Sequence, residues 1–451
     1  MPYLRSSRYF ADLDPKSYET KAKTNEGQPV IIILALLQPP AVRPPHEVNR
    51  VAGPATSGIV VIAGATIIDG RGGAPIVDGV VIIRGGRIAA VGSRAAVAVP
   101  RVGEVVDGTG LSIMPGLIDA HFHLDGDQGL PALYLRHGIT SVRDPGAWIE
   151  NYDSVRATGR AIPRLFLAGP HLDQPPPAYP EDSYLVRDAL ETRTAVNRLI
   201  DQGASVIKVY FRLPPSLITE AVGTAHRRGV PVTAHLETVD ALAAMATGVD
   251  GIEHITSFGT AMLPPPAAER YRQSVLADNN ARHDGRYQVW SRIELGSSRA
   301  GDVIREIVRR GVFVSPTLAV FEQRTGDQGA AAFHVDGFRN MMAFTGMVRR
   351  AGARVVVGSH SSVPHAERGW AYQREMELLV EAGLSPMEAI VAGTMENARF
   401  FRIADRLGSL ERGKGADLVL VEGRPDQDIT AMRRIRRVML NGVWVEPDQT
   451  P

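Results

Sequence analysis

Five histidines and one lysine stand in or at the ends of short apolar runs of the sequence. Alternate residues of a strand point to the same face, so His121 and His123 face one way together. Imidazole is a good ligand for zinc and similar ions. A single histidine in a strand is more often a core residue, but several at the same end of successive strands are hard to explain by packing. We therefore predict a metal site here; the six residues are His121, His123, Lys208, His235, His254 and His360.

The elements that must position these residues are eight apolar runs separated by amphipathic helical stretches such as LITEAVGTAHRRG and DVIREIVRRG. This alternation indicates βα units and a parallel sheet, and eight units predict an α/β fold, a (β/α)₈ TIM barrel. Active sites of that fold lie at the C-terminal ends of the strands. The long polar stretch 261–298 is expected to be a substrate-covering loop. The runs are 113–123, 140–146, 164–170, 205–211, 231–236, 251–256, 312–318 and 355–360.

Two further sets of Val- and Ile-rich runs flank the barrel, one on each side. IVVIAGATIIDG and GVVIIRGGRIAAVG precede it, and ADLVLVEG and RRVMLNGVWVE follow it. Gly-Gly and Asp-Gly turns between such runs are typical of antiparallel strands. We therefore predict a small β-sandwich domain from residues 58–112 plus 405–447, a barrel domain over 113–404, and a leader over 1–57.

Composition limits the possible partners. Of the 451 residues, 44% are hydrophobic and 22% charged, as in a soluble globular protein, and the net charge of +1 gives no argument for nucleic acid as a partner. The chain has no cysteine, which excludes thiolate metal ligands and cysteine nucleophiles. We expect a small-molecule substrate, no nucleic acid, no stable membrane span and a homo-oligomer.

The leader contains one ambiguous segment, VIIILALL, followed by QPPAVRPP. The apolar run is too short to span a bilayer but has the length of a signal-peptide centre. The residues before it are too many and too acidic for a signal peptide. One interpretation is a disordered or loosely packed leader in a cytoplasmic protein. The other is a signal peptide around Val30–Ala41 behind a later translation start, which would make the protein exported or periplasmic.

Three segments resemble the amidohydrolase superfamily. PGLIDAHFH resembles its first-strand signature, GIEHI its sixth-strand histidine, and LGSLERGKGADLVLVEG the return from the barrel to the small sheet. The similarity extends from about Ile59 to Val445. Within the superfamily, VIKVYF, VTAHLE, GVDGIEHI and GLSPMEAI are most similar to imidazolonepropionase-like and prolidase-like enzymes.

The resemblance implies a role for each residue. His121 and His123 would bind a first divalent metal, and His235 and His254 a second. Lys208, carboxylated on its amine, would bridge the two; the alternative is a buried lysine paired with a carboxylate. A hydroxide between the metals would attack the carbonyl carbon. Zinc suits these ligands, one or two ions per chain, although manganese, cobalt and iron are also compatible.

The resemblance has one departure, in the eighth strand. The family usually has Gly-Ser-Asp or Gly-Thr-Asp there, whereas residues 358–360 are Gly-Ser-His. The family's aspartate both binds the first metal and carries a proton to the leaving amine, and one imidazole nitrogen cannot do both at once. Three interpretations stay open. His360 is an adapted catalytic base or metal ligand, or the site holds fewer metals with help from His171, Glu253 or His365, or catalysis is lost.

We therefore expect a metal-dependent amidohydrolase that cleaves an amide or related C–N bond of a small molecule, such as a dipeptide-like compound, an N-acyl amino acid or a cyclic amide. The alternative is a catalytically impaired metal- or ligand-binding member of the same fold. Tyr210, Arg143 and Arg212 are candidate substrate contacts, although each is equally compatible with a structural or solvent-exposed position.

Overall fold

The computed structural model describes residues 21–23, 29–31, 45–49, 51–54 and 58–446. Strands β1 (Lys21–Lys23) and β2 (Pro29–Ile31) form an antiparallel pair in a unit separate from the rest of the chain. The leader prediction for 1–57 and the signal-peptide prediction for 30–41 fall largely outside the described residues. None of the helices in the described part of the chain is long and apolar enough to cross a membrane.

Eight parallel strands form the barrel, and each overlaps one of the eight apolar runs, with β9 and β17 starting one residue before the predicted run, so the predicted fold class is confirmed. Seven of them, all but β17, are buried along their whole length, as expected for strands that helices cover from outside. The barrel strands are β8 (Leu117–Asp119), β9 (Ile139–Asp144), β10 (Arg164–Leu167), β13 (Ile207–Val209), β14 (Val232–Ala234), β15 (Gly251–Glu253), β16 (Phe313–Ser315) and β17 (Arg354–Val355).

Backbone hydrogen bonds close the barrel between its first and last strands. Ala120 N–H donates to the Val357 carbonyl at 2.9 Å, and His360 N–H donates to the His121 carbonyl at 2.7 Å. After β10 the third strand continues as β11 (His171–Asp173), which pairs with β13 and with the short β12 (Ser183–Leu185). The residues that follow β8 and β17 are therefore held side by side.

Amphipathic helices cover the strands, and local sequence sets their ends. Helix α3 starts after Asp188, whose side chain accepts from Glu191 N–H, and ends at Gly203 with φ of 112°. Helix α9 starts after Ser297 and ends at Gly311 in the same way. The helices are α1 (Leu130–Arg136), α2 (Asp153–Ala157), α3 (Ala189–Gln202), α4 (Pro215–Arg227), α5 (Ala241–Ala246), α6 (Gly259–Met262), α7 (Pro265–Ala277), α8 (Arg282–Ser291), α9 (Ser298–Arg310), α10 (Ala332–Arg350), α11 (Ala371–Glu381), α12 (Pro386–Val391) and α13 (Asn397–Phe400).

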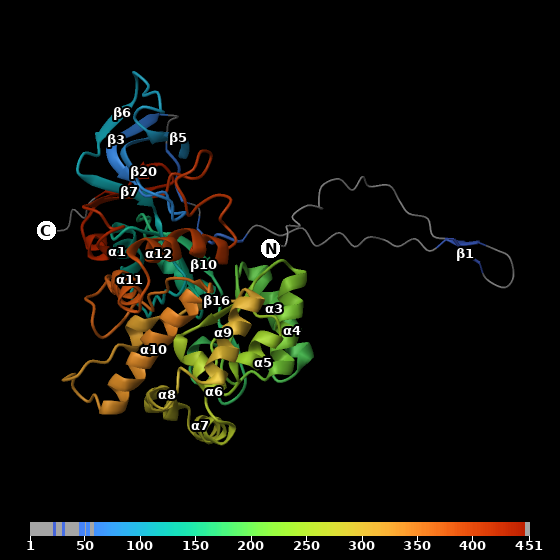
Figure 1. The fold of residues 1–451 in the computed structure, drawn as a ribbon. Helices are drawn as coiled ribbons and strands as arrows, with labels where there is room; N and C mark the ends of the chain where they lie inside the picture. The colour runs from blue at the N-terminus through green and yellow to red at the C-terminus, as the bar shows by residue number, and fades with distance from the viewer. Residues whose placement is uncertain (1–20, 24–28, 32–44, 50, 55–57, 447–451) are drawn as a thin grey trace, which may run out of the picture. The chain divides into compact units, whose positions relative to one another are not determined.

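Both ends of the described chain build a separate, mostly antiparallel sheet. Figure 1 shows blue strands from the N-terminal side together with the red β20 in this sheet. β7 and β18 pair antiparallel, with Met114 opposite Val419, and so join the two segments. The strand order is β20 (Val443–Trp444), β19 (Ile435–Leu440), β18 (Leu418–Glu422), β7 (Leu111–Pro115), β3 (Ile59–Ile67), β4 (Ile76–Arg84) and β5 (Arg87–Ser93), with β6 (Glu104–Asp107) paired to β3.

The stretch 261–298 differs from the loop predicted for it. Helices α7 and α8 occupy most of it, joined by a short turn of 3₁₀ helix, η4 (Asn279–Ala281). Apolar residues on the two helices, including Tyr271 and Trp290, are buried. The polar composition of the stretch hid these few apolar positions, which are enough to fix helices on a barrel surface.

Candidate metal centre

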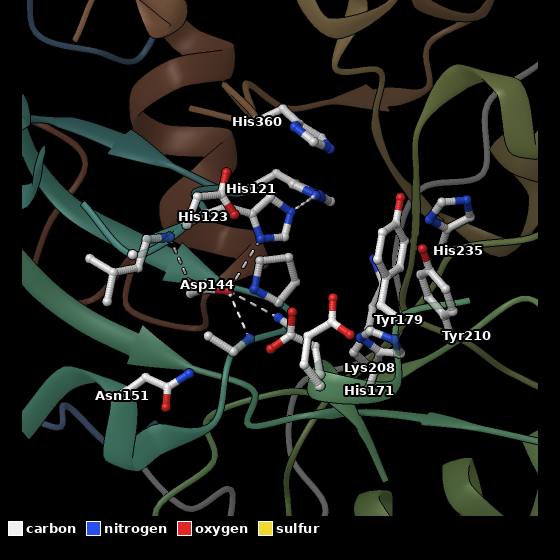
Figure 2. Close-up of a pocket in the computed structure, with 18 of the residues that line it drawn as sticks. His121, His123, Asp144, Asn151, His171, Tyr179, Lys208, Tyr210, His235 and His360 are labelled. Atoms are coloured by element: carbon white, nitrogen blue, oxygen red, sulfur yellow. Dashed lines mark hydrogen bonds and ion pairs between the residues drawn. The ribbon is translucent and has the colours of Figure 1, made fainter. Parts of the chain in front are cut away.

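A cavity of about 1040 Å³ opens at the C-terminal ends of the barrel strands. Its floor carries all six residues that the sequence singled out, and Figure 2 shows five of the six labelled around it. His121 and His123 follow β8, His235 follows β14, and His254 follows β15. The structure thus brings together His121, His123, Lys208, His235, His254 and His360 in one cavity.

Three of these residues form what we call the histidine cluster: His121, His254 and His360. Each offers a ring nitrogen, and the three nitrogens lie within 4.8 Å of one another. Burial lowers the pKa of His121 to about 4 and lowers the pKa of His254 and His360 well below the ordinary value. The rings are therefore neutral near pH 7, and a neutral imidazole has the lone pair that binds a metal ion.

A buried carboxylate fixes the orientation of His121. Its Nδ1 lies 2.9 Å from Glu253 Oε2, and the other Glu253 oxygen accepts from Thr233 Oγ1 at 2.7 Å. Burial alone would raise the pKa of Glu253, but Lys208 and His121 outweigh it and hold that pKa well below its usual range. The ionised carboxylate only accepts, so His121 Nδ1 carries the proton and Nε2 carries the lone pair that can bind a metal.

Two members of the histidine cluster have backbone conformations that non-glycine residues rarely adopt. His254 has φ of 59° and His360 has φ of 60°. Such conformations cost about 1–3 kcal/mol each and persist where the surroundings impose them. Here His254 N–H donates to the Ser315 carbonyl at 2.8 Å, and His254 Nδ1 lies 2.7 Å from Thr317 Oγ1. The strain points to a functional role for these two positions.

Gly358 permits the close approach of the eighth strand to the first. A Cβ atom at this position would meet the His121 Cβ at 2.6 Å and the Ser315 Oγ at 2.6 Å. Both contacts are shorter than real Cβ contacts, so any side chain would push His121 out of place. The glycine therefore contributes directly to the geometry of the histidine cluster.

Lys208 is the least satisfied polar group in the cavity floor. Its side chain is nearly inaccessible, with 2% exposure for the residue, and its Nζ has no hydrogen-bond partner among the described residues. Burial lowers the pKa of Lys208 to about 8. An unpaired buried ammonium is costly, so this amine is suited to a chemical change or to a ligand that satisfies it.

Two sequence-predicted ligands make other contacts. His123 Nδ1 lies 3.5 Å from Asp144 Oδ1 while its Nε2 lies 3.0 Å from His121 Nε2. His235 Nε2 lies 3.3 Å from Glu237 Oε1 and accepts from Arg286 Nη2 at 3.1 Å. Arg286 on α8 also forms an ion pair with Glu237. The ring of His235 lies against that of His254, with centroids 4.4 Å apart, but its Nε2 is engaged by Glu237 and Arg286.

Of the three predicted substrate contacts, one lines the cavity and two do not. Tyr210 lines the cavity, with its ring centroid 4.0 Å from that of His171. Arg143 does not line it; its guanidinium lies over the rings of Phe400 and Phe401 and donates to the Phe400 carbonyl. Arg212 also lies outside the lining and donates to Asn279 on η4. Of the three residues named as possible assistants, His171 lines the cavity, Glu253 orients His121, and His365 pairs with Asp327.

Several cavity residues were missed by the sequence analysis. Asp144 ends β9 and accepts from Tyr152 Oη at 2.7 Å and from the backbone N–H groups of Gly146 and Ala147. Its place at the end of a predicted strand was a usable signal. Arg286, another cavity residue, gave no such signal, because it meets its partner Glu237 only once α8 has formed.

One buried carboxyl supports the cavity wall from behind. Glu375 on α11 accepts from Ala319 N–H at 2.8 Å, within the 3₁₀ turn η5 (Leu318–Phe321) that supplies Val320 and Phe321 to the cavity. Its other oxygen is buried and has no partner among the described residues. Burial raises the pKa of Glu375 to about 8, so the carboxyl is mostly protonated at neutral pH.

Comparison with known proteins adds a family to this geometry. Residues 112–445 match the sequence model of the amidohydrolase family. A stretch of 67 residues is 52% identical to an N-acyl-D-aspartate deacylase from Alcaligenes xylosoxydans xylosoxydans, but the match covers 15% of this chain and only 12% of that protein.

Similar solved structures extend over most of the chain. They include a Xaa-Pro dipeptidase with methionine bound in its active site (TM-score 0.67, 20% identity, 86% of this chain and 100% of that one). A prolidase in complex with N-methylphosphonate-L-proline is similar to the same degree (TM-score 0.67, 22%, 86% and 100%). So is the ochratoxinase of A. niger (TM-score 0.67, 19%, 86% and 95%). At these identities the likeness shows the shared fold.

Proposed function

The chain belongs to the amidohydrolase family, and from that membership we propose that it is a metal-dependent hydrolase that cleaves an amide or related C–N bond of a small molecule. The observation that carries the proposal is the histidine cluster, three neutral imidazoles, two buried and one half-buried, whose nitrogens lie within 4.8 Å of one another in an open cavity. A hydrophobic core gains nothing from such a grouping, whereas a divalent cation is held by it.

The donor set fits a divalent metal. His121, His254 and His360 would hold the first ion, with His123 beside them, and zinc is the ion we expect. When bound, the ion supplies a water of lowered pKa and polarises the substrate carbonyl. A second ion would require His235 to exchange its contacts with Glu237 and Arg286 for the metal, so one ion per chain is the simpler state.

Lys208 is proposed to be carboxylated on Nζ. The neutral amine attacks the carbon of CO₂, a C–N bond forms, and one proton leaves to solvent, which produces an anionic carbamate. The lowered pKa makes the neutral amine available near pH 8, and the carbamate oxygens would satisfy a buried group that has no partner among the described residues. Labelling with ¹³C-bicarbonate tests this directly, because a carbamate carbon resonance that disappears in Lys208→Arg is expected.

The rest of the cavity would orient the substrate. Tyr210, Phe321 and Val320 supply apolar and aromatic walls that exclude water around the reacting bond. His360 lies in the histidine cluster, and its Nδ1 is buried without a partner among the described residues. We assign His360 as an adapted metal ligand. The proton for the leaving amine would then come from another group in the cavity, because the family's aspartate is absent at this position.

The decisive experiment combines metal analysis with an activity screen. The purified protein should contain zinc, and it should hydrolyse members of a panel of N-acyl amino acids, dipeptides, cyclic amides and lactones. A chelator should abolish this activity and zinc should restore it. The His226→Ala variant is the matched control, because His226 pairs with Asp250 away from the cavity and should leave metal content unchanged.

A second candidate function is a metal- or ligand-binding protein without turnover. Two observations favour it: the position of the family's aspartate is His360, and Arg286 with Glu237 engages His235. Tight binding of a panel member to zinc-replete protein, with no hydrolysis of any compound, would support this candidate over the hydrolase.

A further inference from the structure

One side of the cavity is unusually rich in carboxylates. Its lining includes six acidic residues against one lysine and one arginine. The acidic residues come from the loop after β8, from β9 and the segment after it, and from the 3₁₀ turn η2 (Pro180–Asp182) that precedes β12. They are Asp125, Asp144, Glu150, Asp153, Glu181 and Asp182, and the two cationic residues are Lys208 and Arg286.

Two of the six carboxylates are already used within the protein. Asp144 accepts from Tyr152 and lies beside His123, and Asp153 pairs with Arg156. The other four have no ion pair with a lysine or arginine in the described part of the chain, and we call them the carboxylate wall: Asp125, Glu150, Glu181 and Asp182. Arg286 does not offset them, because it is paired with the buried Glu237.

Asp182 is the innermost member of the carboxylate wall. It is half-buried, whereas the other three are exposed. Burial raises the pKa of Asp182, and the charges of Asp144 and Glu181 raise it further. The next residue, Ser183, has its Oγ 3.1 Å from His171 Nε2, a residue of the cavity floor. A carboxylate in this position is stabilised by an incoming cation.

The loops that carry the wall are tied to each other. Trp148 Nε1 donates to the Glu181 carbonyl at 2.7 Å, which joins the segment after β9 to the η2 turn. Two observations independent of the carboxylates indicate that a small molecule enters here. Lys208 Nζ is buried in the same cavity without a partner among the described residues, and the histidine cluster lies in its floor.

We propose that the substrate carries a cationic group, an ammonium or a guanidinium, that binds Asp182 and the carboxylate wall while the scissile C–N bond lies at the histidine cluster. This inference rests on the proposed hydrolase function and names its substrate class: a dipeptide-like or N-acyl amino acid compound with a positive charge. A metal ion at the histidine cluster adds positive charge to the cavity floor, which leaves the wall as the cation-attracting part. A cleft with one sign of charge also concentrates ligands of the opposite sign.

The experiment compares N-acetylated substrates that differ in side-chain charge, on zinc-replete protein. N-acetyl-lysine, N-acetyl-norleucine and N-acetyl-glutamate differ in charge at one end. We expect kcat/KM to fall in that order. Asp182→Asn should reduce the lysine-to-norleucine ratio about tenfold, the change expected for loss of one charge-assisted hydrogen bond. The control Asp302→Asn, on the exposed face of α9, should leave the ratio unchanged.

Unblocked dipeptides distinguish the two sources of the cation. If the α-ammonium is the group that binds, alanyl-norleucine should exceed N-acetyl-norleucine in kcat/KM, and Asp182→Asn should remove the difference. If a side-chain cation binds, N-acetyl-lysine alone should show the effect of Asp182. Equal rates for the three acetylated compounds together with equal rates for alanyl-norleucine and N-acetyl-norleucine, or a charge preference that Asp182→Asn leaves intact, would overturn the proposal.

A binding arm separates this proposal from the hydrolase proposal. If no compound is hydrolysed, calorimetry with lysinamide and norleucinamide on zinc-replete protein still tests the wall. Tighter binding of lysinamide that is lost in Asp182→Asn would retain the cation site while the hydrolase fails. Equal binding of the two amides, with neither weakened in Asp182→Asn, would overturn the cation site whatever the activity.

Discussion

The floor of the cavity and its outer wall are built in opposite ways. The histidine cluster is neutral and held at the ends of barrel strands, with His121 and His254 buried, His360 half-buried and two members in strained backbone conformations. The carboxylate wall is mostly exposed, charged and carried by loops. Strand ends fix positions well enough for chemistry, whereas loops bring charge to a site without disturbing it. We therefore expect substitutions in the histidine cluster to change the rate of reaction, and changes to the carboxylate wall to change the choice of substrate.

The largest effect is expected when a member of the histidine cluster is removed. His254→Ala should lower the zinc content per chain and should abolish hydrolysis. The loss of activity should exceed the roughly 10–100-fold that loss of a supporting residue costs. Elemental analysis checks the metal and the substrate panel checks the rate. Normal zinc content in this variant would remove His254 from the metal centre.

His360 tests whether the floor has adapted to an imidazole. His360→Ala removes one of the three proposed ligands, so it should lower both the zinc content per chain and the turnover. His360→Asp should also lower turnover, because the neighbouring histidines are arranged around a ring. Higher turnover in His360→Asp would show instead that the rest of the site still supports the family's mechanism and lacks only the carboxylate.

Glu375 is an intermediate case, a buried carboxyl behind the cavity wall. Its folded-state pKa of about 8 lies above the ordinary value of 4.5, so the folded protein keeps a proton that the unfolded chain loses. Stability from this group is therefore complete below about pH 4.5 and falls as the pH rises through about 8, by on the order of a few kcal/mol in total. Glu375→Gln should flatten this part of the stability curve measured by urea unfolding between pH 5 and pH 8. An unchanged slope would contradict the assignment.

Glu253 should affect metal affinity without removing a ligand. Glu253→Gln keeps the shape but gives His121 Nδ1 a neutral partner in place of a carboxylate. We expect zinc affinity to fall by roughly 10–100-fold, as for other supporting carboxylates. Competition with a chromophoric chelator measures this. Thr233→Val, which removes only the hydroxyl bonded to the same carboxylate, should have a smaller effect.

Salt should act on the wall and spare the floor. Exposed charges are screened over about 10 Å at 0.1 M salt and about 3 Å at 1 M. The preference for N-acetyl-lysine over N-acetyl-norleucine should therefore shrink several-fold across this range, while the rate with norleucine changes little. A preference that is insensitive to salt would place the selectivity in apolar packing.

The sequence predicted the residues of the cavity floor. It did not predict which three histidines form the histidine cluster, or which residues form the carboxylate wall. Each barrel strand and each histidine could be assigned from local patterns, because burial of a strand and the end of a strand are properties of a few neighbouring residues. Which three histidines converge depends on barrel closure. The pairing of Arg286 with Glu237 depends on α8, which lay in a stretch predicted to be a loop. The whole of β9, β10 and β11 lies between Asp125 and Asp182 in the sequence, so no local pattern connects these two residues.

Barrel closure has a consequence for the order in which the protein matures on the ribosome. The hydrogen bonds from Ala120 to Val357 and from His360 to His121 join the first barrel strand to the last. In the small sheet, β7 likewise pairs with β18, which is synthesised much later. A nascent chain that has emerged only as far as α10 has His121 and His254 but no partner for either closure. Contacts this distant in sequence form late. The proposed metal centre should therefore form only after synthesis is complete, and a chain truncated before β17 should neither retain zinc nor escape proteolysis.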